Sequence, residues 1–198
     1  MARLVFVALV AIAVAASGLL GYLIVEVFRG GENGAVIGQA QVGGPFELVD
    51  GEGRTVTDEE FRGEYMLVYF GYTYCPDVCP TELQNMSRAL ELLGEEAEAV
   101  RPVFITVDPE RDTPEVIESY VENFHPRMVG LTGSPEQIEK AAKSYRVYYK
   151  KAESGSASEY LMDHTSIVYL MGREGEFLRH FGYGTSPEDM AQGIRSYL

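Results

Sequence analysis

The hydrophobic pattern divides the chain into an uncharged N-terminal run and a longer region of short alternating segments. The run Leu4–Val25 contains no charged residue. As a helix with a rise of 1.5 Å per residue it would be about 33 Å long, enough to cross a hydrocarbon core of ~30 Å. The pattern therefore predicts a transmembrane anchor over residues 1–28. A cleavable signal peptide is the alternative, but its apolar region is usually only about 7–15 residues long.

Charges on either side of the apolar run indicate its orientation. Arg3 and the terminal amine precede it, and Glu26 and Arg29 follow it. The positive-inside tendency then places the N-terminus in the cytoplasm and the remainder on the other side. We expect a single-pass protein of the inner membrane, with its domain facing the periplasm. Residues 29–44 predict a flexible linker, because six of these sixteen residues are glycine.

From residue 45 to residue 198 the pattern predicts one globular domain. A hairpin is expected over 46–57, a helical turn over Asp58–Phe61, and a buried central strand over Met66–Tyr72. Further helices are expected over 83–93, 116–124, 138–145 and 190–197, further strands over 102–107 and 128–131, and a second hairpin over 166–181. Three Ser-Pro or Thr-Pro pairs mark helix starts, namely Thr113-Pro114, Ser134-Pro135 and Ser186-Pro187.

Strands that alternate with helices and close with a hairpin and a helix are the element order of a thioredoxin-like α/β domain. About 150 residues are a normal length for one such domain. The composition, 46% hydrophobic and 23% charged, excludes a disordered or fibrous chain. A formal net charge of −14 argues against nucleic acid as a partner. This acidity is better explained by a solubilising surface than by attraction of a cationic partner.

The two cysteines of the chain, Cys75 and Cys79, lie together in the segment Gly71–Pro80, between the central strand and the next helix. Cys79 falls at the predicted helix start, where backbone N–H groups and the helix dipole lower the pKa of a thiol. Three intervening residues leave room for both sulfurs to face one metal ion. Soft thiolates select Cu(I) over hard cations, and an imidazole would make a two-sulfur site trigonal.

Other uses of the cysteine pair remain open at this point. A structural disulfide is sterically feasible, but closing so short a loop removes little entropy from the unfolded chain. Zinc is disfavoured because structural zinc sites usually have four protein ligands. A thiol–disulfide reductase needs the same two thiols. A peroxidase is disfavoured because the Pro-x-x-x-Thr-x-x-Cys pattern is absent.

Three segments carry a resemblance to a known family: residues 71–80, residues 107–114, and Asp163-His164-Thr165-Ser166. With the predicted anchor in front of them, they resemble the SCO/SenC family of copper chaperones for cytochrome oxidase assembly. The resemblance covers residues 46–198 and implies a thioredoxin-like fold with a mobile loop before the histidine. It matches Cys75 and Cys79 to the copper-binding thiols and His164 to the histidine ligand.

The resemblance implies a metallochaperone, not an enzyme, that carries Cu(I), with Cu(II) as the second oxidation state to consider. Its expected partners are the copper-accepting subunit of cytochrome c oxidase and a periplasmic copper donor or thiol reductant. The alternative function is a membrane-anchored thiol–disulfide reductase that prepares the oxidase cysteines. We expect His164 to lie at a loop tip, from which it can swing away and let the metal leave.

Structural roles are expected for the remaining candidates near these motifs. Asp108 and Asp112 match acidic residues of the family, although turn formation and helix capping explain them as well. The other residues with expected structural roles are Asp77 in a turn, Met162 in packing, His125 at a helix end, and His180 on a hairpin strand.

Overall fold

The structure is a computed structural model in which residues 18, 42–152 and 160–198 are described. The chain separates into two units, residues 1–40 and residues 41–198, and each is considered by itself. Apart from residue 18, the predicted anchor lies outside the described residues, as does most of the predicted linker. Among the described residues, no helix has the length and apolar character needed to cross a membrane.

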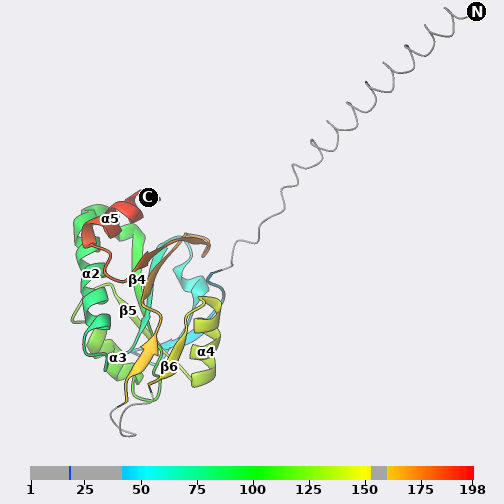
Figure 1. The fold of residues 1–198 in the computed structure, drawn as a ribbon, viewed down its shortest axis with the longest axis vertical. Coiled ribbons are helices and arrows are strands. Elements are labelled where there is room, and N and C mark those ends of the chain that lie inside the picture. Colours follow the sequence, from blue (N-terminus) through cyan, green and yellow to red (C-terminus); the bar gives the residue numbers. More distant parts are fainter. Residues whose placement is uncertain (1–17, 19–41, 153–159) are drawn as a thin grey trace, which may run out of the picture. The chain divides into compact units, whose positions relative to one another are not determined.

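A seven-stranded sheet with the order β2-β1-β5-β4-β3-β8-β9 forms the centre of the domain (Figure 1). Its strands are β1 (Glu47–Asp50), β2 (Thr55–Thr57), β3 (Tyr65–Gly71), β4 (Val100–Thr106), β5 (Val129–Thr132), β8 (Ile167–Met171) and β9 (Phe177–Gly182). Strands β3, β4 and β5 are parallel, and the other pairs are antiparallel. The apolar runs of β3 and β4 are buried, as expected for strands covered on both faces.

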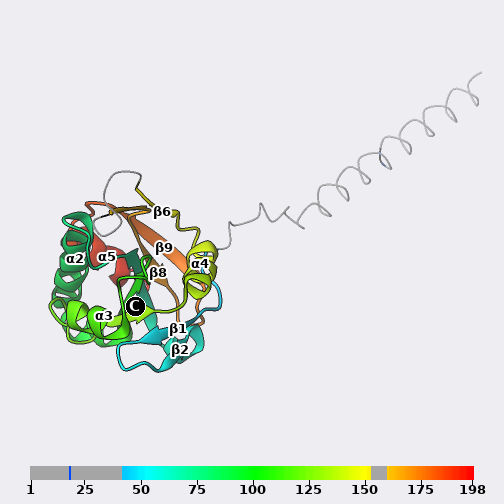
Figure 2. The same cartoon turned by 90° about the horizontal axis from the view of Figure 1, so that it is seen from below.

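Helices cover both faces of this sheet. They are α2 (Val78–Leu93), α3 (Pro114–Val121), α4 (Pro135–Ser144) and α5 (Pro187–Arg195). Figures 1 and 2 show α2, α3 and α5 on one face and α4 on the other. Neighbouring side chains of β3 follow this division. The Phe70 ring lies 5.2 Å from the ring of Tyr145 at the end of α4, whereas Tyr69 stacks on Phe104 towards α3.

The predicted helix starts are confirmed. The hydroxyls of Thr113, Ser134 and Ser186 accept hydrogen bonds from backbone N–H groups in the first turns of α3, α4 and α5. Each is followed by proline at a position where the missing N–H costs nothing. The short helix η1 (Asp58–Phe61) also lies where it was expected. A second short helix, η2 (Gly94–Ala99), follows α2 directly.

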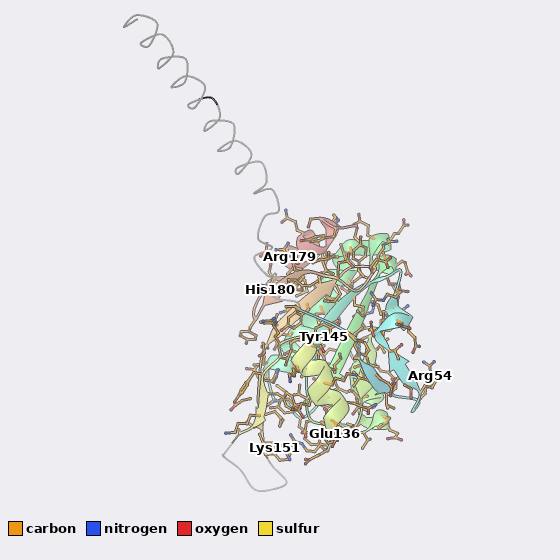
Figure 3. The ribbon with its side chains drawn as sticks, turned by 90° about the vertical axis from the view of Figure 1, so that its right-hand side faces the viewer. Arg54, Glu136, Tyr145, Lys151, Arg179 and His180 are labelled. Carbon is orange, nitrogen blue, oxygen red and sulfur yellow. The ribbon has the colours of Figure 1, made fainter. Side chains whose placement is uncertain are left out.

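A second, two-stranded antiparallel sheet was not predicted as a separate unit. It consists of β6 (Tyr149–Lys151) and β7 (Met162–His164). Each strand has only three residues and carries exposed polar side chains such as Lys150 and Asp163, so neither shows the apolar alternation that marks a strand. Figure 3 labels Lys151 at the end of β6, below Tyr145 and well away from Arg179 and His180 of β9.

The chain packs against the domain earlier than the predicted linker boundary at Gly44. Val42 lies against the core, and the N–H of Gly43 donates to the carbonyl of Ser144 at 2.9 Å. Gly43 has a φ of +86°, and a Cβ at this position would collide with the side chain of Met171. The last three residues of the predicted linker are therefore held on the domain surface.

Candidate metal centre

The loop from β3 to α2 carries both cysteines. Gly71 ends β3, and a turn in which the Cys75 N–H donates to the Tyr72 carbonyl (3.3 Å) leads towards α2. Cys79 is the second residue of α2 and is completely buried, whereas Cys75 is half-buried on the preceding loop. The sequence prediction that Cys79 lies at a helix start is confirmed.

Gly71 allows the Cys79 thiol to lie against the end of β3. A Cβ at position 71 would be 2.9 Å from Cys79 Sγ and 2.9 Å from Phe104 Cε2. Neither neighbour has free space, because both side chains are fully buried. The absence of a side chain at Gly71 thus sets the depth at which the buried thiol sits.

The side chain of Asp112 holds the cysteine loop in place. Its buried carboxylate accepts hydrogen bonds from the Thr73 N–H (3.0 Å), the Thr73 hydroxyl and the Thr106 hydroxyl. Burial raises the pKa of Asp112, and the donors on Thr106 and Thr73 act in the opposite direction. Helix capping, the expected role of this carboxylate, belongs to Thr113 instead. Sequence inspection missed this role because Thr73 and Asp112 are 39 positions apart.

His164 comes from β7, where it pairs with Tyr149 of β6. The expectation of a loop tip is wrong, because His164 is the last residue of a strand. The Nδ1 atom of the imidazole lies 3.1 Å from the carbonyl oxygen of Thr165, to which it donates in the tautomer with hydrogen on Nδ1. In that tautomer Nε2 has a free lone pair, as a metal-ligating histidine requires.

The structure brings the three predicted ligands together. Cys75 Sγ, Cys79 Sγ and His164 Nε2 all lie within 4.8 Å of one another, and both cysteines are free thiols. The distance from Cys79 Sγ to His164 Nε2 is 3.3 Å. Ligands ~2.0–2.3 Å from one metal lie roughly 3.5–4 Å apart in a trigonal arrangement. Small side-chain adjustments therefore suffice to place all three around a single ion.

The two thiols differ in acidity. The pKa of Cys75 is lowered to about 3 by a hydrogen bond from the Cys79 side chain, by His164, and by the backbone N–H groups of Cys79 and Asp77. Burial raises the pKa of Cys79, and the neighbouring Cys75 sulfur adds to this effect. We expected the helix start to lower the pKa of Cys79. Instead, the Cys79 N–H points at Cys75 Sγ (3.3 Å), so this N–H group at the helix start lowers the pKa of Cys75.

An open cleft leads from solvent to this cluster. It is lined by Cys75 and His164 together with Tyr72, Pro76, Asp77, Val78, Leu161, Met162, Asp163, Ser166 and Tyr183. Asp77 is exposed and makes no capping hydrogen bond with its side chain. Leu161 and Tyr183 are exposed apolar residues of the rim. A metal ion or a partner protein can therefore reach Cys75 without rearrangement of the core.

The other residues noted in the sequence lie apart from the cluster or have structural roles. Met162 is buried in the core. His125 accepts a hydrogen bond on Nδ1 from the Arg127 N–H, and burial together with Arg127 lowers its pKa, so it is a neutral structural residue. His180 is exposed and stacks on Phe177 with ring centroids 6.3 Å apart.

The sheet order, the helices on both faces and the thiol pair at the start of α2 define a thioredoxin-like α/β protein with a candidate site for a soft metal. The chain belongs to the SCO1/SenC family, whose family model matches residues 34–198. The resemblance noted in the three sequence segments is thus confirmed.

Individual relatives support the same assignment. The chain is 45% identical over 166 residues to the protein sco1 of Schizosaccharomyces pombe, covering 82% of this chain and 63% of that protein. It spans about half to two thirds of the length of the curated relatives that it matches.

Two solved structures add information on chemistry. ScoI of Bradyrhizobium japonicum, whose structure has copper bound, is 46% identical with a TM-score of 0.73, covering 79% of this chain and 99% of that one. BsSco is 28% identical with a TM-score of 0.64, covering 80% of this chain and 94% of that one. It is a member of the Sco family of cytochrome c oxidase assembly proteins in which a disulfide switch has been identified.

Proposed function

We propose that this protein is a copper metallochaperone that delivers copper to the binuclear copper site of cytochrome c oxidase during assembly. The observation that carries the proposal is the convergence of Cys75, Cys79 and His164, with all three ligand atoms within 4.8 Å of one another. Two thiolates and one imidazole form a soft donor set that suits Cu(I). The copper bound by ScoI and the assembly role of BsSco agree with this assignment.

In this proposal each ligand has a separate task. Cys75, whose low pKa keeps it ionised at neutral pH, makes the first sulfur contact with copper in the cleft. Cys79 releases its proton to solvent when copper binds, because the ion stabilises the thiolate. His164 offers Nε2 as the third ligand. Transfer then proceeds by ligand exchange with sulfur ligands of the acceptor, so that copper is never free.

A thiol–disulfide reductase is the second candidate. The specific observation in its favour is the pair of free thiols with unequal acidity, together with the disulfide switch identified in BsSco. An ionised Cys75 would attack a target disulfide and Cys79 would resolve the mixed disulfide. That reaction needs no imidazole, so His164 favours the metallochaperone.

The proposed setting is the inner membrane, with residues 1–28 as an uncleaved anchor and the domain on the periplasmic side. A flexible linker over residues 29–41 would have a root-mean-square reach of roughly 18–22 Å. The domain would then remain close to the copper-accepting oxidase subunit and to a periplasmic copper donor or thiol reductant. Intact mass of the mature protein tests this, and an N-terminus near Ala16 would contradict it.

Copper stoichiometry of the reduced full chain tests the proposed function. We expect one Cu(I) per chain by elemental analysis, with an X-ray absorption spectrum that shows two sulfur ligands and one nitrogen ligand. A first coordination shell without sulfur would refute the metallochaperone. The reductase is tested in parallel with His164→Ala, which should retain disulfide reduction and bind copper less tightly.

A further inference from the structure

Arg111 lies between the two halves of the candidate metal centre, on the connection from β4 to α3. Its side chain is only 15% exposed. Nε donates to the carboxylate of Asp108, which is 1% exposed, and Nη1 donates to the backbone carbonyl of Tyr160 at 3.0 Å. One guanidinium thus joins the β4–α3 connection to the chain that leads into β7.

Three tyrosine rings surround the same guanidinium. Its central carbon lies 3.8 Å from the ring centroid of Tyr160, 4.7 Å from that of Tyr74 and 5.9 Å from that of Tyr72. Nη2 of Arg111 is buried and has no hydrogen-bond partner within the described ranges. Contact with aromatic faces replaces that hydrogen bond, because the ring quadrupole attracts a cation.

The rings belong to the two segments that supply the metal ligands. Tyr72 and Tyr74 lie on the cysteine loop, directly before Cys75. Tyr160 lies four residues before His164, and its hydroxyl donates to Asp108 at 2.7 Å. The Tyr72 ring also meets the His164 imidazole edge-on, with centroids 5.8 Å apart. Arg111 therefore contacts the sulfur side and the histidine side of the site together.

This connection matters because hydrogen bonds of the seven-stranded sheet fix the chain after His164 but not His164 itself, since β8 pairs with β3 only from Val168 onward. The cysteine loop extends from β3 of the seven-stranded sheet, whereas His164 ends β7 of the two-stranded sheet, and the two sheets share no ladder. Side-chain contacts therefore have to hold β7, which precedes that pairing, at the right spacing from Cys79. The cluster of Asp108, Arg111 and Tyr160 occupies the position from which it can do so.

We propose that Arg111 is the positioning residue that holds His164 within coordinating distance of the cysteine pair, acting through Asp108 and Tyr160. The inference rests on the proposed copper-carrying function. Arg111 touches no ligand atom in these contacts, so its effect on copper passes through the placement of His164. The planar guanidinium is essential to this role, because an ammonium group cannot both fork between two acceptors and stack on a ring.

Copper release from the full chain measures this role. Arg111→Lys keeps a cation beside Asp108 but loses the fork and the stacking. We expect Cu(I) to pass to a chromogenic Cu(I) chelator about 10- to 100-fold faster than from the unmodified protein, the range typical for residues that orient metal ligands. The X-ray absorption spectrum should retain two sulfur ligands and lose the nitrogen ligand.

Arg127→Lys is the matched control. The side chain of Arg127 is similarly shielded, with 22% exposed. Its guanidinium also donates to two acceptors, the backbone carbonyls of Ala97 and Glu98. It lies near Glu64, at the opposite end of β3 from the cysteines. We expect its copper release to match that of the unmodified protein.

A double-mutant cycle separates positioning from general loosening. In a His164→Ala background, Arg111→Lys should cause no further acceleration, because the group that it positions is gone. Equal acceleration in both backgrounds, or none in either, would overturn the proposal. Tyr160→Leu, which removes the stacked ring, gives a second reading by the same assay if Arg111→Lys does not fold. Failure of the unmodified protein to bind copper through sulfur would refute the proposed function itself.

Discussion

The two sides of the candidate metal centre are held by very different amounts of structure. The cysteine side extends from the buried strand β3 into the sixteen-residue helix α2. Asp112 ties the cysteine loop to β4 with two hydrogen bonds from Thr73 and one from Thr106. The histidine side is a three-residue strand, paired with one other three-residue strand in a sheet of its own. Local opening requires less free energy where fewer buried contacts are broken.

Because of this difference, we expect the two sides to have different roles in copper binding and release. A rigid pair of sulfurs can keep the same geometry through loading and transfer. A weakly held imidazole can leave first and open a coordination position for an incoming sulfur of the acceptor. We therefore expect the thiols to determine copper affinity and His164 to determine the rate of release.

Loss of either sulfur is the strongest test of this division. Cys75→Ser or Cys79→Ser should lower Cu(I) affinity by about 1,000-fold or more, ~4 kcal/mol, because a hard hydroxyl replaces a soft thiolate. Competition with a Cu(I) chelator measures the change. Retention of tight binding by either single variant would show that the sulfur pair does not dominate affinity.

Loss of the imidazole should have a smaller effect on affinity than loss of a sulfur. His164→Ala leaves two sulfurs that can hold Cu(I) in a linear geometry. We expect affinity to fall by roughly 10- to 100-fold, ~1.4–2.8 kcal/mol, and copper release to be faster by a similar factor. Stopped-flow transfer to a chelator measures the release. The three-ligand arrangement would be wrong if both quantities matched those of the unmodified protein.

The contrast between the two sides also explains what the sequence could predict. The strand Met66–Tyr72 and the capped helices were found because apolar periodicity and Ser-Pro or Thr-Pro pairs are local signals. The two cysteines were equally visible, since both lie in one ten-residue segment. His164 was identified through a family resemblance, and the sequence alone placed it at a loop tip instead of at the end of β7.

Contacts between distant segments were not predictable in the same way. The Asp112 carboxylate reaches Thr73 across 39 positions, and the Arg111 side chain reaches Tyr160 across 49. No periodicity or spacing marks such pairs. The acidity of the thiols was assigned to the wrong residue for a related reason, because it depends on which sulfur faces the Cys79 N–H and which is buried.

Gly71→Ala tests the rigidity of the cysteine side directly. The added methyl would lie 2.9 Å from Cys79 Sγ and Phe104 Cε2 and would displace the buried thiol. We expect copper affinity to fall by about 10- to 30-fold, ~1.4–2 kcal/mol. Gly182→Ala is the control, because a Cβ at that position of β9 meets nothing within 4 Å. Equal affinities in the two variants would mean that the sulfur side adapts as readily as the histidine side.

The smallest expected effect concerns the acidity of the two sulfurs in the copper-free protein. A thiol with its pKa lowered to about 3 stays ionised above that pH and is protonated only below it, so Cys75 should react with iodoacetamide at pH 5. Its ionised fraction exceeds that of an ordinary thiol by about 10⁴ at this pH, but the nucleophilicity of a thiolate falls with its pKa. The net advantage over a free cysteine peptide is then about tenfold.

Cys79, buried and with a raised pKa, should remain unmodified under the same conditions. Peptide mapping by mass spectrometry identifies the modified residue, with Cys75→Ser as the control that should show no reaction. Preferential labelling of Cys79 would mean that the helix start, and not the Cys79 N–H directed at Cys75, controls which sulfur is ionised.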